Sequence, residues 1–297
     1  MAITSFTAVK ANLGASYRNY NEDAYIFSRM RGQAISNLYY TAVGTVIGVG
    51  SATPGVATGD VNTVTIDGQN FQYFVAGAYA ATAPQARSTP LGLVIFVDAV
   101  DNDGFEFAPT LVEAITPSAT GIPTDGTIQA PTRLVAAGGD VYTSRTDNCF
   151  VRVKLAIQDV SAHDFVCVGF RKTEVPVDAL TSYTDYFVLN INNGTAEIRN
   201  RLNTGTETVS VSTETVADAG TVTLEVRVDT SGVARAIINN VAMAVDVIGF
   251  KFDSGDLLMP FLKMQNDGVD GGSVAIQEWE QGPWDQRGLA SLGDITN

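Results

Sequence analysis

Alternation of apolar and polar residues with a period of two is the dominant pattern from about residue 91 onward. Valine, leucine and isoleucine occupy every second position over residues 151–157 and again over 222–228, with mostly polar residues between them. This pattern predicts strands with one face in a core and the other face toward water. We find no long stretch with apolar residues at helical spacing, so the sequence predicts an all-β protein.

Turn residues separate these strands at short intervals. Asp, Ser and Gly at 229–232 end the strand 222–228, and Asn239-Asn240 suits a tight hairpin because asparagine tolerates positive φ. Residues 253–256 form a further turn, and residues 273–279 predict a closing strand. Short strands with turn signals about every 8 to 12 residues are typical of a sandwich or barrel.

The strand 151–157 is expected to pair with residues 165–171 through a hairpin near Ser161. That pairing would hold Cys149 and Cys167 about 20 Å apart, at about 3.3 Å per residue, whereas a disulfide needs Cα atoms within about 7 Å. We therefore expect two reduced core cysteines, which fits folding in a reducing cytosol.

The first third of the chain differs in texture, with Gly-rich and Ala-rich patches and one strand pair, 62–66 and 71–75, around an Asp-Gly turn. Prolines at 84 and 90 bracket a polar connection. We expect an N-terminal arm or small β extension over 1–87, a β-sandwich over 88–285 and a C-terminal tail over 286–297.

Charge and composition exclude several classes of function. The 18 basic and 32 acidic side chains of the 297 residues leave 18 − 32 = −14 at neutral pH, which argues against nucleic acid and anionic lipid as partners. The most apolar window, 41–57, is too short for the roughly 20 residues of a spanning helix, and the first thirty residues lack the pattern of an export signal. Two cysteines and one histidine leave little material for thiol, zinc or imidazole chemistry, and we expect no cofactor.

Two groupings resemble catalytic arrangements. Glu278 and Glu280 flank Trp279 and point to one face of a strand, as paired carboxylates do in glycosidases. We interpret them instead as solvated carboxylates on an outer face. His163 lies beside Asp164 and Ser161, but neighbours on one tight turn rarely achieve triad geometry, so a surface turn residue is expected. The sequence predicts a protein that is not an enzyme.

Two acidic loops have the oxygen-rich composition of calcium loops, because hard cations bind clustered carboxylates. The loops contain Asp101 and Asp103 in one case, and Asp267 and Asp270 in the other. The EF-hand frame fails around Gly104, since Ala99 and Thr110 occupy the first and last ligand positions. An ordinary β-turn is the preferred interpretation, with a calcium loop as the alternative.

Tyrosines and β-branched residues crowd the N-terminal region and are candidates for intersubunit contacts, since tyrosine is favoured at interfaces. Packing of the arm on its own sandwich is the equal alternative. Residues 46–49 would be an aggregation hazard as an exposed edge strand unless a neighbouring subunit covers them. The interface candidates are Tyr17, Tyr20, Tyr25, Tyr39, Tyr40, Val46, Ile47 and Val49.

The order of these pieces resembles the second half of concanavalin-like or laminin-G-like jelly-roll domains. The similarity rests on the strand TVTLEVRVD, the turn DTSG, the return ARAIINN, the strand PFLKMQN and the final VAIQEWE, and covers roughly residues 91–284. The Glu-x-Asp-x-x-Glu strand of concanavalin-like glycosidases is missing. The resemblance implies an antiparallel β-sandwich of the jelly-roll type.

The acidic, Gly/Ala/Thr/Val-rich chain also resembles head-decoration and fibre proteins of tailed bacteriophages. That resemblance implies a structural protein of the virion, made in the host cytoplasm and not secreted. We expect a decoration or cement protein attached through its N-terminal arm, with the major capsid protein as partner. A homo-oligomer is expected, with a trimer as the guess from lattice symmetry.

The alternative is a carbohydrate-binding module of a fibre or host-recognition structure. Such a module would use loops at the rim of the sandwich, where aromatic rings stack on sugars and acidic or amide groups bind hydroxyls. Trp284 and the loop 266–272 are the candidates for glycan contacts.

Overall fold

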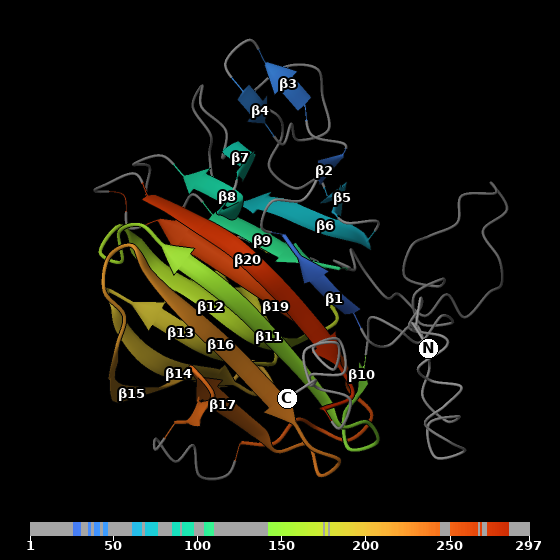
Figure 1. The fold of residues 1–297 in the computed structure, drawn as a ribbon. Helices are drawn as coiled ribbons and strands as arrows, with labels where there is room; N and C mark the ends of the chain where they lie inside the picture. The colour runs from blue at the N-terminus through green and yellow to red at the C-terminus, as the bar shows by residue number, and fades with distance from the viewer. Residues whose placement is uncertain are drawn as a thin grey trace, which may run out of the picture.

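The computed structural model describes more than half of the chain, and its arrangement is drawn in Figure 1. The described residues are 26–30, 35–36, 39–41, 44–46, 61–66, 69–76, 85–89, 91–97, 104–109, 142–174, 176–177, 179–243, 250–266, 268 and 272–284.

Two antiparallel sheets stack face to face in this part of the chain (Figure 1). The eight-stranded sheet runs in the order β18 (Val241–Ala242), β17 (Ala234–Ile238), β16 (Gly220–Val228), β11 (Cys149–Ile157), β20 (Gly272–Gly282), β8 (Gly92–Val97) and β7 (Gln85–Thr89). Its eighth strand, β1 (Ile26–Arg29), also pairs with β20. The antiparallel β-sandwich that the sequence predicts is thereby confirmed.

The ten-stranded sheet lies behind the first sheet in Figure 1. Its order is β15 (Thr208–Thr215), β14 (Thr195–Arg201), β13 (Tyr186–Asn192), β12 (His163–Lys172), β19 (Leu257–Asn266), β9 (Gly104–Ala108), β6 (Gln69–Ala76), β5 (Val61–Ile66) and β2 (Ile35–Ser36), with β10 (Tyr142–Thr143) on β19. A separate pair joins β3 (Tyr39–Thr41) and β4 (Gly44–Val46). The helical content of the described residues is the 3₁₀ turn η3 (Leu180–Ser182).

The core fills the space between the two sheets and follows the two-residue period. In β11 the apolar positions from Val151 to Ile157 are fully buried, whereas Arg152 and Lys154 on the other face are half-buried. Trp279 of β20 lies edge-on to Phe71 and Phe107, at 6.0 and 5.8 Å between ring centroids. The sandwich is therefore closed by aromatic contacts between its sheets.

The hairpin expected between residues 151–157 and 165–171 is wrong. β11 pairs with β16 and β20, whereas β12 pairs with β13 and β19 in the other sheet. The connection near Ser161 therefore crosses from one sheet to the other. Period-two alternation shows which face of a strand is buried, but it does not identify the neighbouring strand.

Both cysteines are free and buried, as expected. Their positions differ from those in the hairpin on which this expectation was based. The thiol of Cys149 lies in the core between the sheets. Cys167 belongs to a second apolar cluster on the outer face of the ten-stranded sheet. One sheet thus separates the two side chains.

The predicted turns in the C-terminal half are confirmed. β16, β17 and β18 follow one another as a meander, and Asn239 and Asn240 have φ of 49° and 67°. The closing strand is present as β20, and the turn at 253–256 precedes β19. Asparagine at both central positions of the second turn provides the left-handed backbone of a tight hairpin.

Apart from the separate pair β3–β4, the described strands of residues 1–87 are hydrogen-bonded into the two large sheets. β5 and β6 form the expected hairpin, with Ile66 opposite Gln69, and β6 continues onto β9. The expected boundary at residue 87 falls inside β7, which pairs with β8. The division into an arm, a sandwich and a tail stays a prediction.

A second apolar cluster covers the outer face of the ten-stranded sheet. The segment between β12 and β13, which includes η3, packs its side chains on this face, with Leu180 and Tyr183 nearly or fully buried. They lie against Phe261 and Met259 of β19 and Val188 of β13. We call the described residues of 173–185 the covering segment, and its two ends line the site described next.

Candidate functional site

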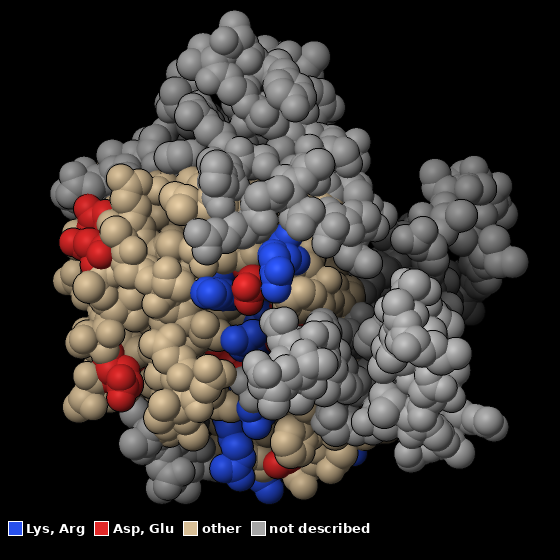
Figure 2. Space-filling view, viewed as in Figure 1, with Lys and Arg blue, Asp and Glu red and all other residues tan. Residues whose placement is uncertain are grey.

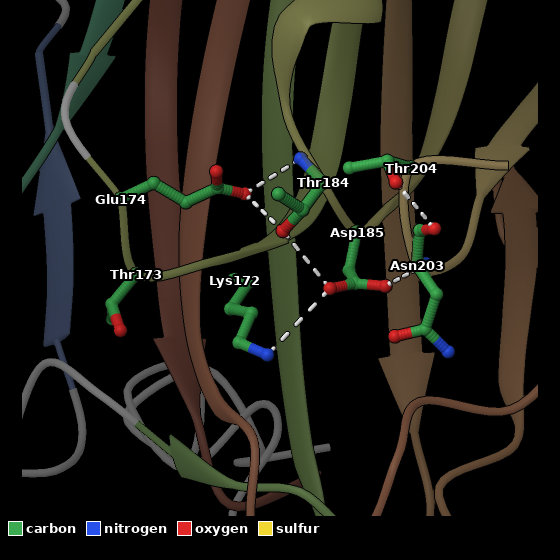
Figure 3. Close-up of a pocket in the computed structure, with 7 residues that line it drawn as sticks. All are labelled: Lys172, Thr173, Glu174, Thr184, Asp185, Asn203 and Thr204. Carbon is green, nitrogen blue, oxygen red and sulfur yellow. Dashed lines mark hydrogen bonds and ion pairs between the residues drawn. The ribbon is translucent and has the colours of Figure 1, made fainter.

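An open pocket of about 430 Å³ lies at one end of the ten-stranded sheet, and Figure 3 shows its lining. Every lining side chain carries a hydroxyl, amide, carboxylate or ammonium group. The residues are Lys172, Thr173, Glu174, Thr184, Asp185, Asn203 and Thr204. The pocket is therefore suited to a polar ligand with several hydrogen-bonding groups.

Strand order brings these residues together. Lys172 ends β12, Asp185 immediately precedes β13, and Asn203 follows the end of β14. The strands β12, β13 and β14 are antiparallel neighbours. The end of β12, the start of β13 and the end of β14 therefore lie together at one end of the sheet. Three segments that are separated in sequence thus form one rim.

A left-handed turn forms one wall of the pocket. Asn203 and Thr204 have φ of 52° and 56°, and the N–H of Gly205 donates to the carbonyl of Leu202 at 2.9 Å. Asparagine tolerates this conformation, but a β-branched threonine there is an outlier that costs of order 1–3 kcal/mol. The surrounding contacts must hold this strained turn in place.

Asp185 is the group that holds the turn. Its carboxylate is 1% exposed and accepts a hydrogen bond from the backbone N–H of Asn203 at 2.5 Å. The carbonyl of Thr184 accepts from the N–H of Thr204 at 3.0 Å. Hydrogen bonds to a buried carboxylate are among the stronger ones in proteins, so the pocket wall is fixed before a ligand arrives.

Two carboxylates of the pocket share one hydroxyl donor. The hydroxyl of Thr184 lies 2.7 Å from Oε1 of Glu174 and 3.0 Å from Oδ2 of Asp185, but a hydroxyl has a single proton to donate (Figure 3). The backbone N–H of Thr184 donates to the same Oε1 at 2.8 Å. One of the two carboxylates therefore has spare accepting capacity toward the pocket.

Lys172 supplies the positive charge of the pocket. Its Nζ lies 2.7 Å from Oδ1 of Asp256 and 3.7 Å from Oδ2 of Asp185. The hydrogen bond to Asp256 raises the pKa of Lys172, and the charges of Asp256, Asp185 and Glu174 add to this effect against a smaller opposing effect of burial. The ammonium group therefore remains a donor at neutral pH.

A buried charge cluster anchors the covering segment from below. Glu106 of β9 pairs with Nε of Arg171 at 2.9 Å and with Nζ of Lys263 at 3.2 Å, and it accepts from the hydroxyl of Tyr183 at 2.5 Å. All four side chains are fully buried. Lys263 also donates to the carbonyl of Val177 at 2.6 Å, so the cluster ties the segment to the sheet.

Arg171 connects this cluster to the pocket. Its Nη1 donates to the carbonyls of Lys172 at 3.1 Å and Glu174 at 2.9 Å. Burial raises the pKa of Glu106, but the charges of Arg171 and Lys263 and the hydrogen bonds from Tyr183 and Lys263 lower it more, so the pKa lies below 4.5. Glu106 is ionised at neutral pH and holds both cations in place.

The sequence pattern does not predict this pocket. Its lining residues lie in polar connections that look ordinary one at a time. The available signal was the segment Leu202-Asn203-Thr204-Gly205, where Asn and Gly around one residue indicate a left-handed turn. Their meeting with the segment after β12 depends on sheet order, which the alternation pattern does not contain.

The interpretation of Glu278 and Glu280 as solvated carboxylates is wrong for Glu280. It is 4% exposed and pairs with Arg152 at 3.3 Å, while Glu278 is half-buried. Both lie on the outer face of the eight-stranded sheet, where Arg152 of β11 is directly opposite Glu280 of β20. The cross-strand partner Arg152, which the sequence pattern alone does not show, supplies the counter-charge that a buried carboxylate needs.

His163 is likewise buried and not a surface turn residue. It begins β12 and is 2% exposed. A Cβ on Gly272 would lie 2.6 Å from its Nε2, so the imidazole occupies the space that glycine leaves at the start of β20. Asp164 beside it is exposed, and Ser161 bonds Asp159, so these residues form no triad.

The remaining candidates lie largely outside the described residues. That holds for Tyr17, Tyr20, Tyr25, Ile47, Val49, Asp101, Asp103, Asp267 and Asp270. Tyr39 and Tyr40 are in β3, and Val46 ends β4.

Within the described ranges no group of three or more His, Cys, Asp or Glu side chains could hold a metal ion. Trp284 is 41% exposed, with the guanidinium of Arg227 at 5.6 Å from its ring centroid.

Comparisons with known proteins agree with the fold. No family model matches the chain, and no curated protein matches it. Solved structures that match include the carbohydrate recognition domain of Emp47p, at 11% identity, TM-score 0.48 and coverage of 91% of this chain and 99% of that one. At such identities and with TM-scores below 0.5, the likeness concerns architecture and carries no functional argument.

Two further structures match in the same way. The carbohydrate recognition domain of Emp46p in its potassium-bound form has 6% identity and a TM-score of 0.44, covering 71% of this chain and 88% of that one. A carbohydrate binding module, CBM66 from Bacillus subtilis, has 8% identity and a TM-score of 0.38, covering 71% of this chain and 94% of that one.

Among the described residues, no helix has the length and apolar character needed to cross a membrane.

Proposed function

We propose that this chain is a carbohydrate-binding β-sandwich whose pocket at the end of the ten-stranded sheet binds a glycan through its hydroxyl groups. The observation that carries the proposal is the excess of carboxylate acceptors around one hydroxyl, that of Thr184. A sugar presents several adjacent hydroxyls, each able to donate one hydrogen bond and to accept others. Such a ligand can donate to Glu174 when the Thr184 hydroxyl donates to the buried Asp185.

The donors of the pocket complement these acceptors. Lys172 brings an ammonium group, and the Asn203 amide and the Thr173 hydroxyl bring further polar groups to the same lining. Donors and acceptors side by side can bind two neighbouring hydroxyls, one as an acceptor and one as a donor. An uncharged glycan fits this mixture better than a strongly anionic ligand, because two carboxylates accompany the single ammonium.

The acidic groups have binding and structural roles in this proposal, and no reaction is assigned to them. Asp185 fixes the turn through Asn203, and Glu174 fixes the start of β13 through the N–H of Thr184. These two carboxylates thereby fix the backbone of the pocket wall before a ligand binds. Preorganisation lowers the entropic cost of binding a flexible, polar ligand.

A glycan array tests the proposal. The full chain is applied to neutral oligosaccharides, and a hit is measured again by calorimetry with the Glu174→Gln variant. Because the amide removes an acceptor charge, we expect an affinity loss of about tenfold, which equals about 1.4 kcal/mol. Glu214→Gln is the matched control, since Glu214 is an exposed residue of β15 away from the pocket lining.

Two results would reject the proposal. One is an array without any neutral glycan bound, and the other is a hit whose affinity is unchanged in Glu174→Gln. A parallel array with a chelator tests the predicted alternative of calcium loops, because only a calcium-dependent site would lose its hits.

A second candidate function is a structural role in a bacteriophage particle, as a decoration or cement protein bound to the major capsid protein. The exposed edge strand β15 favours it, because Val209 and Val211 are 44% and 62% exposed there. An edge strand with exposed β-branched residues can add to a neighbouring sheet. Counting copies of the chain in purified particles tests this role, since hundreds indicate the head, a few dozen or fewer indicate a fibre or tail part, and none contradicts it.

A further inference from the structure

The outer face of the eight-stranded sheet concentrates positive charge in a chain of net charge −14. Among the side chains that the structure describes, strand register puts five cations on this face. Figure 2, in the orientation of Figure 1, shows Lys and Arg along this face with acidic side chains between them. The five cations are Arg29 of β1, Arg152 and Lys154 of β11, Arg227 of β16 and Arg235 of β17. We call this set the basic face.

Carboxylates neutralise only part of the basic face. Glu225 contacts Arg227 at 2.5 Å, and Glu280 contacts Arg152 at 3.3 Å. Glu278 is the third carboxylate, opposite Lys154 in the register. Among the side chains that the structure describes, five cations and three carboxylates leave 5 − 3 = +2 on this face, whereas the whole chain has a net charge of −14.

Three of the cations have no partner among the residues that the structure describes. Arg29 and Arg235 are exposed and Lys154 is half-buried, and none of them makes a hydrogen bond or an ion pair there. Their charges are available to a ligand. They are not part of the contacts that hold the sheets together, so they can be changed without unfolding the sandwich.

Two arginines face each other at one end of the basic face. Arg227 and Arg235 are directly opposite in the β16–β17 register. Like charges in this position destabilise a strand pair. The ring of Trp284, with the Arg227 guanidinium 5.6 Å from its centroid, lies beside them and is 41% exposed. An anion bound between the two arginines would remove their repulsion.

We propose that the basic face binds an acidic polysaccharide, with its carboxylates on the cations and a sugar ring against Trp284. The cations occupy β17, β16, β11 and β1, and with β20 these are five neighbouring strands, which span about 19 Å at about 4.8 Å per strand. That length accommodates several sugar units. The surface is separate from the pocket, and the proposal does not depend on the pocket.

The alternating charges favour a polysaccharide over a nucleic acid. Glu225, Glu278 and Glu280 lie between the cations, and a phosphate backbone with one charge per about 1.7 Å would be repelled by them. A uronate chain carries hydroxyl groups between its carboxylates, and those hydroxyls can donate to the glutamates. The exposed indole adds an apolar surface for the face of a sugar ring.

The test is binding of polygalacturonate to the full chain by calorimetry at about 50 mM and about 300 mM salt. We expect binding that weakens with salt, and a loss of at least about tenfold in the Lys154→Gln, Arg235→Gln double variant. Arg145→Gln is the matched control, because it removes an exposed cation at the loop before β11. Its affinity should stay within about twofold of the parent protein.

Dextran and a short DNA duplex complete the experiment. Absence of polygalacturonate binding at low salt, or an equal loss in Arg145→Gln, overturns the proposal. Tighter binding to DNA than to polygalacturonate also overturns it and assigns the face to nucleic acid. Thermal unfolding of each variant confirms that it folds, and Trp284→Ala provides a second route to loss of binding. Glu174→Gln, which tests the pocket, should bind polygalacturonate like the parent protein, so the two proposals fail separately.

Discussion

Arg171 and Glu106 form a fully buried ion pair at 2.9 Å, on the outer face of the sheet and not in the core between the sheets. The same arginine holds the carbonyls of two pocket residues, Lys172 and Glu174. The position of the pocket rim thus depends on a carboxylate that does not line it.

Replacing Glu106 with glutamine should destabilise the protein strongly. The change leaves Arg171 and Lys263 buried without their counter-charge, and loss of one partner of a buried pair costs about 3–5 kcal/mol. Urea unfolding measures the free energy of unfolding of each variant. Tyr183→Phe is the comparison, because it removes the hydroxyl that donates to Glu106 and accepts from the N–H of Val177, but it removes no charge, and it should cost about 1–3 kcal/mol. Equal losses in the two variants would show that the charges contribute little.

Acid should weaken the protein through the same carboxylate. Burial raises the pKa of Glu106, but the effects of Arg171, Lys263 and Tyr183 outweigh burial and bring the pKa below its ordinary 4.5. Because the folded-state pKa is depressed, this stabilisation is fully present above about pH 4.5 and is lost as pH falls through the folded-state pKa. Urea unfolding as a function of pH should show a steeper acid loss for the parent protein than for Glu106→Gln. Parallel curves would contradict this assignment.

The two thiols should be unreactive in the folded protein. Burial, with a further contribution from Asp147, raises the pKa of Cys149 well above 9.0. Burial raises the pKa of Cys167 to about 12, despite the opposing charges of Lys263 and Arg199. The thiolate is the reactive form, so alkylation by iodoacetamide at neutral pH should require unfolding. Mass spectrometry before and after addition of denaturant measures the alkylation of each thiol. Rapid labelling of the native protein would contradict the burial.

Gly169 should tolerate no side chain. A Cβ there would lie 2.1 Å from the backbone carbonyl oxygen of Phe187 on the neighbouring strand β13, so Gly169→Ala should cost about 3 kcal/mol or more. Gly255→Ala is the control. That position has φ +84° but open space around it, and the left-handed backbone should cost about 1–2 kcal/mol. Thermal unfolding ranks the two variants, and the reverse order would disprove the register of β12 and β13.

Asp185→Asn should loosen the pocket wall. The buried carboxylate accepts from the backbone N–H of Asn203, and loss of a charged acceptor costs about 1.5–3 kcal/mol. Asp218→Asn is the matched control, because Asp218 also accepts a backbone N–H, from Val160 at 3.0 Å, but is exposed. Hydrogen exchange of the Asn203 amide should quicken in the first variant only. Unchanged exchange would show that the turn is held by other contacts.

Local pattern was sufficient for the strands and their turns. The burial of the apolar positions in β11, the left-handed turn at Asn239-Asn240 and the closing strand around Trp279 all follow from period-two hydrophobicity and turn chemistry. The pairing of β11 with β12 was predicted wrongly, because both orders of strands bury the same faces.

Residues near in sequence determined that this chain is an antiparallel sandwich with a mostly apolar interior. Tertiary structure alone decided that Lys172, Asp185 and Asn203 meet in one pocket and that Arg227 faces Arg235. The physical reason is that alternation specifies which side of a strand is buried through local solvation. Which strand lies beside it depends on hydrogen bonds between segments far apart in the chain, and those contacts bring the polar groups together.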